Sequence, residues 1–462
     1  MRIAMFTNTY LPQIGGVAQS VARFTAGYRR LGHPTVVVAP AYQQRDGGLG
    51  STQRFAHTGG RMAAAQDDAT AACEDETGDV VRVPALRRFK GSDFSFAVPA
   101  ACDLNASMDS FDPDIVHAHH PFLLGTEAAR VAAARDVPLV FTHHTMYEWY
   151  THYVPLEIPS MRTFIRQLAT GYANLCDCVF APSASVGEIL RRRGVESPVR
   201  TVPTGVDVER FASGRGRAFR RRDGVPPDAL LIGHVGRLAA EKNLAFLADA
   251  VIRAMRDLPQ ARAAWVGSGP LLGSLQRRFT RAGMAERAHF LGSRSGQDLV
   301  DAYDAMDVFV FASKTETQGM VLAEALAAGC PCVALDAPGA REVVADGRAG
   351  RLVRDEDVEV FAAAVREVAE EVAGGDSGAS QVRERARAAA EPFSDARCID
   401  RALAAYEEIV ASDRKRADID RSDWAVIARA IKREWDIWSN RVGSLGQVAR
   451  EKLDSEGFTT PR

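Results

Sequence analysis

Short apolar segments alternate with segments of helical periodicity along most of the chain. Residues 1–9 and 34–40 (PTVVVAP) have the pattern of buried strands, and a helical pattern over 17–31 lies between them. The same alternation returns over 114–207 and again over 229–336. Because strands that alternate with helices form parallel sheets covered on both faces, the pattern predicts an α/β protein with doubly wound parallel sheets.

Two changes of composition divide this pattern. Residues 43–79 are rich in Gly, Ala, Thr, Gln and Asp, which predicts a mobile surface insertion. Gly and Pro gather over 204–229, which predicts a hinge between two α/β domains with the ligand site in the cleft between them. The predicted parts are a first domain over 1–203, a second over 204–392, a helix over 393–412 that crosses back to the first domain, and a helical extension over 413–462.

The extension carries an apolar face that includes Trp424, Trp435 and Trp438. Basic residues lie opposite, so the segment could be a helix in a membrane interface or a helix packed on the body. Glu434 and Asp436 dilute the basic face, which favours packing. The other candidate for membrane contact is the basic and apolar run RVPALRRFKGSDF over 82–94.

Bulk properties narrow the class of protein. A chain of 462 residues is too long for one core, and a net charge of −2 argues against a general nucleic-acid binder. No run approaches 18 apolar residues, and the chain begins directly with a strand pattern, so a cytoplasmic protein is expected. The seven cysteines lack the C-x₂-C spacing of a zinc site and are expected to be small buried hydrophobes.

The run TETQGMVLAEALAAGCPCVA over 315–334 has the most informative chemistry. Glu316 and Glu324 are eight positions apart, and a helical pattern begins after Gly319. Glu316 would lie in the loop before this helix, and Glu324 about one turn inside it. Carboxylates accept hydrogen bonds from sugar hydroxyls, and the free N–H groups at a helix start bind phosphates. Taken without its context, the run is explained equally well by an ordinary helix start followed by a solvent-exposed glutamate.

Two further segments carry ligand-binding chemistry. In GHVGRLAAEKNLAFL over 233–247, Arg237 and Lys242 flank a turn after a strand, where both cations could reach one diphosphate. VGSGP over 266–270 places Gly267 at the end of another strand, where a nucleotide could approach closely. Six of the ten histidines lie between 117 and 152, but their spacing and the lack of a carboxylate clamp argue against a metal site.

Taken together, GRLAAEKN, VGSGP and TETQG…LAEALAAGCPCV resemble, in order and spacing, the retaining glycosyltransferases of family 4. PTGVDVERF over 203–211 and YLPQIGGVAQ over 10–19 resemble the family's entry to its second domain and its N-terminal glycine loop. The resemblance covers about residues 1–411. It implies the GT-B fold, in which two Rossmann-like domains face a central cleft, with the C-terminal helical tail added here.

The resemblance also implies roles for single residues. Glu324 would bind the nucleotide ribose, and Arg237 and Lys242 would hold the diphosphate and stabilise it as a leaving group, so that no metal or other cofactor is needed. Glu316 and His119 would line the donor-sugar site, while His117 would pack. The other expected substrate contacts are Gly16, Gly267 and the segment Gln318, Gly319, Met320 and Val321.

The aromatic segment THHTMYEWYTHYVP over 142–155, with His144 and Tyr147 as substrate contacts, resembles bacterial diacylglycerol glucosyltransferases. The expected reaction is transfer of glucose from UDP-glucose to a lipid such as diacylglycerol, with peripheral contact to an anionic membrane on the inner face of the cell membrane. The alternative is transfer of mannose from GDP-mannose to an inositol lipid or a soluble acceptor. A non-catalytic nucleotide-sugar-binding protein is the alternative of another class; a dinucleotide oxidoreductase is disfavoured because no G-x-G-x-x-G follows the first strand.

Overall fold

The structure is a computed structural model, and it describes most of the chain. Residues 1–13, 15–41, 80–86, 96–97, 104–147, 159–344, 346–374 and 376–419 are described. Four predicted features lie wholly or partly outside these ranges. They are the insertion over 43–79, the tryptophan-bearing part of the extension, most of the basic run over 82–94, and residues 148–155 of the aromatic segment.

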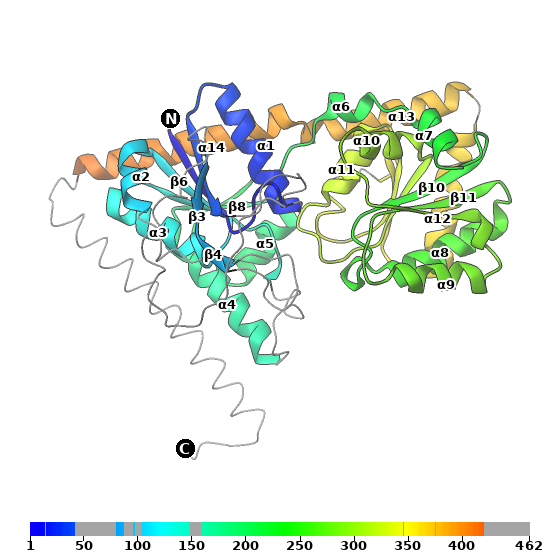
Figure 1. Cartoon of the computed structure of the whole chain (residues 1–462), viewed down its shortest axis with the longest axis horizontal. Helices are drawn as coiled ribbons and strands as arrows, with labels where there is room; N and C mark the ends of the chain where they lie inside the picture. Colours follow the sequence, from blue (N-terminus) through cyan, green and yellow to red (C-terminus); the bar gives the residue numbers. More distant parts are fainter. Residues whose placement is uncertain are drawn as a thin grey trace, which may run out of the picture.

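The first sheet has seven strands in the order β3-β2-β1-β6-β7-β8-β9, and all of its strand pairs are parallel. Helices cover it on both sides (Figure 1). Its strands are β1 (Ile3–Phe6), β2 (Thr35–Pro40), β3 (Val80–Val83), β6 (Ile115–Ala118), β7 (Leu139–Thr142), β8 (Cys178–Ala181) and β9 (Val199–Thr201), and β4 (Ala85–Leu86) pairs separately with β5 (Phe96–Ala97). Its helices are α1 (Gly16–Arg30), α2 (Leu104–Phe111), α3 (Leu124–Arg135), α4 (Pro159–Leu175) and α5 (Ala184–Arg192).

The second sheet has six parallel strands in the order β12-β11-β10-β13-β14-β15. Its strands are β10 (Leu230–Val235), β11 (Ala261–Val266), β12 (Ala288–Gly292), β13 (Val308–Phe311), β14 (Cys332–Leu335) and β15 (Gly350–Val353). The α-helices around it are α6 (Val208–Ala212), α7 (Gly216–Arg222), α8 (Leu244–Asp257), α9 (Leu272–Arg281), α10 (Gly296–Ala305), α11 (Met320–Ala327), α12 (Val358–Ala373) and α13 (Asp376–Ala390). Short 3₁₀ turns are η5 (Ala240–Lys242), η6 (Ala285–Arg287) and η7 (Glu391–Phe393).

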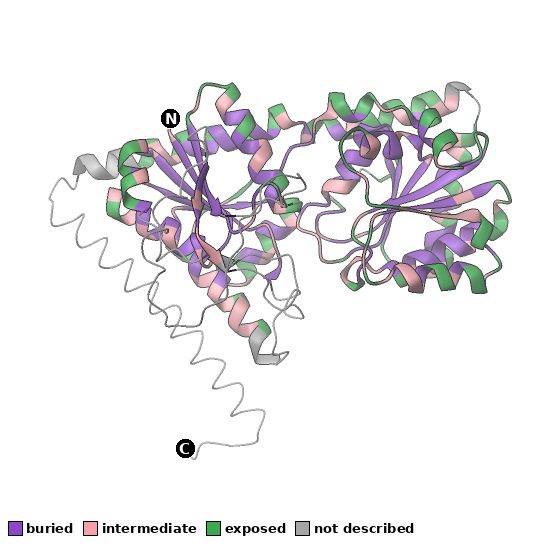
Figure 2. Cartoon of the chain, viewed as in Figure 1, coloured by how far each residue is buried: buried purple, intermediate pink, exposed green. Residues whose placement is uncertain are grey.

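The central strands are apolar on both faces because helices cover both faces. Every residue of β1, β10 and β13 is buried, and the buried strands form the middle of each domain (Figure 2). Polar caps fix several helix starts: Ser183 accepts a hydrogen bond from the amide of Val186, and Asp357 accepts from two amides at the start of α12. The predicted doubly wound α/β architecture with two parallel sheets is therefore confirmed.

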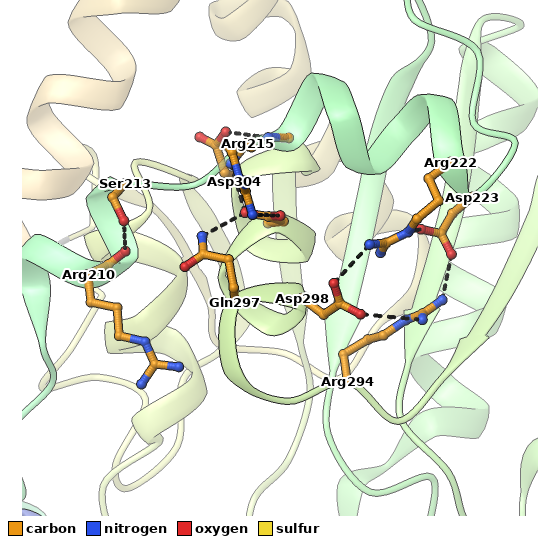
Figure 3. A network of polar contacts seen from close by, with 11 residues as sticks. Arg210, Ser213, Arg215, Arg222, Asp223, Arg294, Gln297, Asp298 and Asp304 are labelled. Carbon is orange, nitrogen blue, oxygen red and sulfur yellow. Dashed lines mark hydrogen bonds and ion pairs between the residues drawn. The ribbon is translucent and has the colours of Figure 1, made fainter.

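The predicted hinge over 204–229 contains two helices that the sequence did not suggest. The amide of Arg215, just before α7, donates to Asp301 of α10 at 3.0 Å, and Arg222 donates to Asp298 at 2.8 Å. Asp223 in turn contacts Arg294, which extends the network across the surface (Figure 3). Residues 215–223 are thus fixed to the second domain, and the connection between the domains is shorter than the composition indicated.

The last helix links the two domains. α14 (Asp395–Ile419) begins near the domain boundary and runs beside α1 of the first domain (Figure 1). Tyr406 of α14 is fully buried there, and its ring lies 5.7 Å from that of Tyr28. The five described cysteines, Cys176, Cys178, Cys330, Cys332 and Cys398, are free and buried, in the role expected of small hydrophobes.

Candidate functional site

Several candidate residues lie just after the strands between which the strand order of each sheet changes direction. The first sheet reverses between β1 and β6, and the second between β10 and β13. Gly16 follows β1 and His119 follows β6, whereas Arg237 and Lys242 follow β10 and Glu316 follows β13. Ligands of doubly wound sheets bind beyond the carboxyl ends of the strands at such reversals. Both domains therefore present candidate residues at the edge where a ligand is expected.

Glu316 and Lys242 form a half-buried ion pair. The Lys242 ammonium contacts Oε1 of Glu316, and the two side chains are 18% and 19% exposed. Burial alone would raise the pKa of Glu316, but the charge and hydrogen bond of Lys242, with a hydrogen bond from Ser313, lower it below its usual value. Glu316 is therefore an ionised carboxylate at neutral pH, poorly suited to donate a proton.

Arg237 lies close to this pair on the same edge. Its guanidinium contacts Glu241, one residue before Lys242. The hydroxyl of Thr315 donates to the carbonyl oxygen of Glu241 at 3.3 Å, and the hydroxyl oxygen of Ser313 lies 3.3 Å from the same carbonyl oxygen. These bonds tie the loop after β13 to the turn after β10, and so bring Arg237, Lys242 and Glu316 into one cluster.

Glu324 has a different environment, inside α11. It is only 8% exposed, and its Oε2 accepts a hydrogen bond of 2.8 Å from the hydroxyl of Tyr303. Its Oε1 lies 3.6 Å from the guanidinium of Arg23, which comes from α1 of the first domain. Burial raises the pKa of Glu324, and Arg23 and Tyr303 oppose this rise only in part.

Two glycines shape the loops around these side chains. Gly319 caps α11 with φ of 70°, in the left-handed region that glycine adopts without strain. A Cβ on Gly267 would lie 1.9 Å from the carbonyl oxygen of Gly236, so two neighbouring loops approach each other there. The close approach at Gly267 is thus made by the protein's own backbone. Gly16, in contrast, begins α1 with open space where a Cβ would stand.

The first domain contributes a group of buried histidines. Nδ1 of His119 shares a hydrogen bond of 2.8 Å with Nε2 of His144, and the rings are stacked. Burial, with repulsion from the neighbouring histidines, lowers the pKa of both, so both are neutral near pH 7. His117 is buried in the first domain, where one ring nitrogen contacts the hydroxyl of Tyr406 and the other lies 2.7 Å from that of Thr142.

Three side chains of the second domain, two of them in the loop before α11, bond to backbone groups of the first domain and of the connection. The hydroxyl of Thr317 donates to the carbonyl oxygen of His144 at 2.8 Å. The side chain of Gln318 accepts from the amide of Thr204 at 2.7 Å and donates to its carbonyl oxygen at 2.6 Å. Glu342 accepts from the amide of Ser185 at 2.8 Å. The Glu316 loop and the histidines of the first domain are therefore direct neighbours.

The remaining predicted contacts lie around this meeting point. Met320 and Val321 form the first turn of α11 and are partly exposed. Tyr147 is 9% exposed and packs its ring against Phe122 and His143, at 5.4 and 5.6 Å between centroids. Sequence reasoning missed Arg23, Tyr303 and the hydroxyl of Thr317, because no local pattern distinguishes these residues from ordinary helix and loop positions.

Other features of the described residues lie apart from this cluster. A surface hollow of about 410 Å³ over α8, α9 and α12 is lined by residues such as Arg253 and Arg278, and it contains none of the candidate residues. Within the described ranges, no three His, Cys, Asp or Glu side chains are grouped as a metal ion would need. No described helix is long and apolar enough to cross a membrane.

Comparison with known proteins supports the resemblance found in the motifs. The family described as "Glycosyltransferase Family 4" matches residues 14–210, and that described as "Glycosyl transferases group 1" matches residues 229–371. The GDP-mannose-dependent alpha-mannosyltransferase of Mycobacterium tuberculosis is 33% identical over 359 residues, which are 76% of this chain and 84% of that protein.

Two further relatives agree with this result. The alpha-monoglucosyldiacylglycerol synthase of Streptococcus pneumoniae is 24% identical over 357 residues, 76% of this chain and 75% of that protein. The crystal structure of Anabaena HepE in complex with UDP is similar in fold, with a TM-score of 0.63 at 20% identity over 88% of this chain and 100% of that one. The chain therefore belongs to the glycosyltransferases of family 4 and has their GT-B fold.

Proposed function

We propose that this glycosyltransferase moves a hexose from a nucleoside diphosphate sugar to a lipid acceptor, with retention of the anomeric configuration and without a metal. One observation carries the proposal: the hydroxyl of Thr317 donates to the backbone carbonyl oxygen of His144, so the loop that carries Glu316, the partner of Lys242, reaches the segment of the first domain whose His144 ring bonds to His119. A donor sugar at this point would contact groups from both domains.

The chemistry follows from where charge develops in the reaction. Breaking the bond between the anomeric carbon and the β-phosphate oxygen leaves negative charge on the diphosphate. Lys242, Arg237 and the first amides of α11 supply fixed positive charge and N–H donors for it. Glu316 is ionised and His119 is neutral, and in this proposal both accept or share hydrogen bonds from the donor sugar. The acceptor hydroxyl oxygen bonds to the anomeric carbon, and the leaving diphosphate oxygen takes the proton of that hydroxyl.

The relatives support two donors to different degrees. The mannosyltransferase shares 33% identity with this chain and the glucosyldiacylglycerol synthase 24%, which makes GDP-mannose the first candidate. UDP-glucose, the donor expected from the sequence, remains the second candidate, supported by the segment over 142–155 and the name of the second relative. That name also supports a diacylglycerol-based acceptor and thus peripheral contact with a membrane.

The test is a panel of radiolabelled donors incubated with the full chain and a total lipid extract, with and without EDTA. We expect labelled lipid from GDP-mannose or UDP-glucose, an α-linkage in the product by NMR, and the same rate with EDTA. Label only in water-soluble products would move the proposal to a soluble acceptor. Binding of both donors without any transfer would indicate the non-catalytic alternative, and an inverted anomeric centre or loss of activity with EDTA would contradict the mechanism.

A further inference from the structure

The carboxylate of Glu324 is contacted from two domains. Tyr303, on α10 of the second domain, donates to Oε2 at 2.8 Å, and Arg23, on α1 of the first domain, lies 3.6 Å from Oε1. A separation of 3.6 Å is an ionic contact but too long for a hydrogen bond. Among the described residues Oε1 thus has a positive charge nearby and no hydrogen-bond donor, whereas Oε2 has a fixed one.

Tyr303 is a rigid donor. Its side chain is fully buried, and its ring packs against those of Phe211 and Phe309 at 5.6 and 5.7 Å between centroids. Burial, with the charge of Glu324, raises the pKa of its hydroxyl, so the proton stays on Tyr303. A carboxylate held at one oxygen by such a donor has little freedom to rotate, so its other oxygen keeps a fixed direction.

Arg23 is anchored independently of Glu324. Its guanidinium donates to the carbonyl oxygen of Gly205 at 2.6 Å, in the connection between the domains, and its side chain is 18% exposed. Its charge is therefore held beside Glu324 by the domain connection. Since burial disfavours the ionised form of Glu324, this neighbouring cation helps to keep the carboxylate an acceptor.

We propose that Tyr303 and Arg23 are positioning residues that hold Glu324 for the ribose hydroxyls of the donor, so that preference for a ribonucleotide over its 2′-deoxy form depends on residues from both domains. This inference rests on the proposed function. It adds that recognition of the sugar of the nucleotide needs the contact between α1 and α11, even though Glu324 belongs to the second domain.

The test measures the dissociation constants of GDP, UDP and their 2′-deoxy forms for the full chain by calorimetry. Wild type should prefer the ribonucleotide. Tyr303→Phe keeps the ring and removes one hydroxyl, and should reduce that preference roughly threefold to tenfold; Arg23→Gln should act in the same direction. Tyr172→Phe removes another buried hydroxyl, and Arg29→Gln another arginine of α1; both should leave the preference unchanged.

A double variant decides whether Tyr303 acts through Glu324. In a Glu324→Ala background, which removes the oxygen that accepts from Tyr303, Tyr303→Phe should have no further effect on the preference. The inference is overturned if Tyr303→Phe weakens both forms equally, if its effect persists in the Glu324→Ala background, or if wild type does not distinguish the two forms. If wild type binds none of the four nucleotides, the proposed function itself fails.

Discussion

At the scale of single residues, the two glutamates of the 315–334 run differ in the charge that surrounds them. Glu316 contacts a lysine and has a lowered pKa, whereas Glu324 is buried against a tyrosine hydroxyl and has a raised one. Their spacing in the sequence predicted that both belong to one helix entry. It did not predict the partners, because Lys242 and Tyr303 come from other elements.

Lys242→Met should destabilise the protein by about 1–3 kcal/mol, because Glu316 would be left half-buried without its cation. Lys242 lowers the pKa of folded Glu316, so the stability that the pair contributes is present above the unfolded value of about 4.3 and is lost as the pH falls through the folded value. The difference in the free energy of unfolding between wild type and variant, measured in urea, should therefore be larger at pH 7 than at pH 3.

The double variant Lys242→Met/Glu316→Gln provides the control for this prediction. It should regain part of the lost stability, because the uncompensated charge is gone, but it should not regain transfer activity. A double variant no more stable than Lys242→Met alone would show that the ion pair is not the cause of the loss.

At the scale of elements, the entry of α11 depends on one backbone conformation. Gly319 has φ of 70°, and a Cβ there would lie 3.1 Å from a methyl of Leu322 and 3.2 Å from the carbonyl oxygen of Gly339. The amides that follow this glycine are the proposed phosphate donors. The conformation of a single loop residue thus sets the direction in which the start of the helix points.

Gly319→Ala should cost about 1–2 kcal/mol of stability and also weaken binding of the nucleoside diphosphate. Gly283→Ala is the matched control, since Gly283 has φ of 73° and open space around a Cβ, and it lies after α9, away from the candidate cluster. We expect both variants to lose a similar amount of stability, measured by urea unfolding, but only Gly319→Ala to lose affinity for the nucleoside diphosphate. Equal nucleotide affinity in the two variants would show that the start of α11 does not bind the nucleoside diphosphate.

Most strands and helices were predictable because their patterns are strong and local. Every residue of β10 and β13 is buried, and such apolar runs are visible in any reading of the sequence. α7 was missed because its residues, GRAFRRR, follow a glycine-rich stretch and owe their place to contacts with α10. β3 was missed because four residues directly after a polar insertion carry little periodicity.

At the scale of the whole molecule, the contact between the domains depends on a few polar side chains. Gln318 is 5% exposed and satisfies both backbone groups of Thr204, whose hydroxyl lies 2.7 Å from that of Ser20 on α1. The sequence pointed to Gln318 as part of the donor site. Its side chain connects the loop before α11 to the chain between the domains, and its backbone leads into the candidate site.

Gln318→Ala should therefore loosen the two domains relative to each other, because the buried amide and carbonyl of Thr204 lose their partners. Limited proteolysis should cut the connection near 204–207 faster than in wild type, and transfer should slow while each domain keeps its fold. Gln297→Ala, which removes a hydrogen bond of 2.8 Å within the second domain (Figure 3), is the control and should be cut as wild type is. Equal cleavage in all three proteins would contradict the role of Gln318.

The sequence by itself determined the class of fold, the family and the segments that carry chemistry, because these follow from periodicity and from motifs a few residues long. The pair Glu316 and Glu324 with Arg237 and Lys242 could be named in this way. Only the tertiary structure decided which groups meet. The contacts of Thr317 with His144, of Gln318 with Thr204 and of Arg23 with Glu324 join residues more than 100 positions apart. Such contacts depend on how two sheets are placed against each other, which leaves no local pattern in the chain.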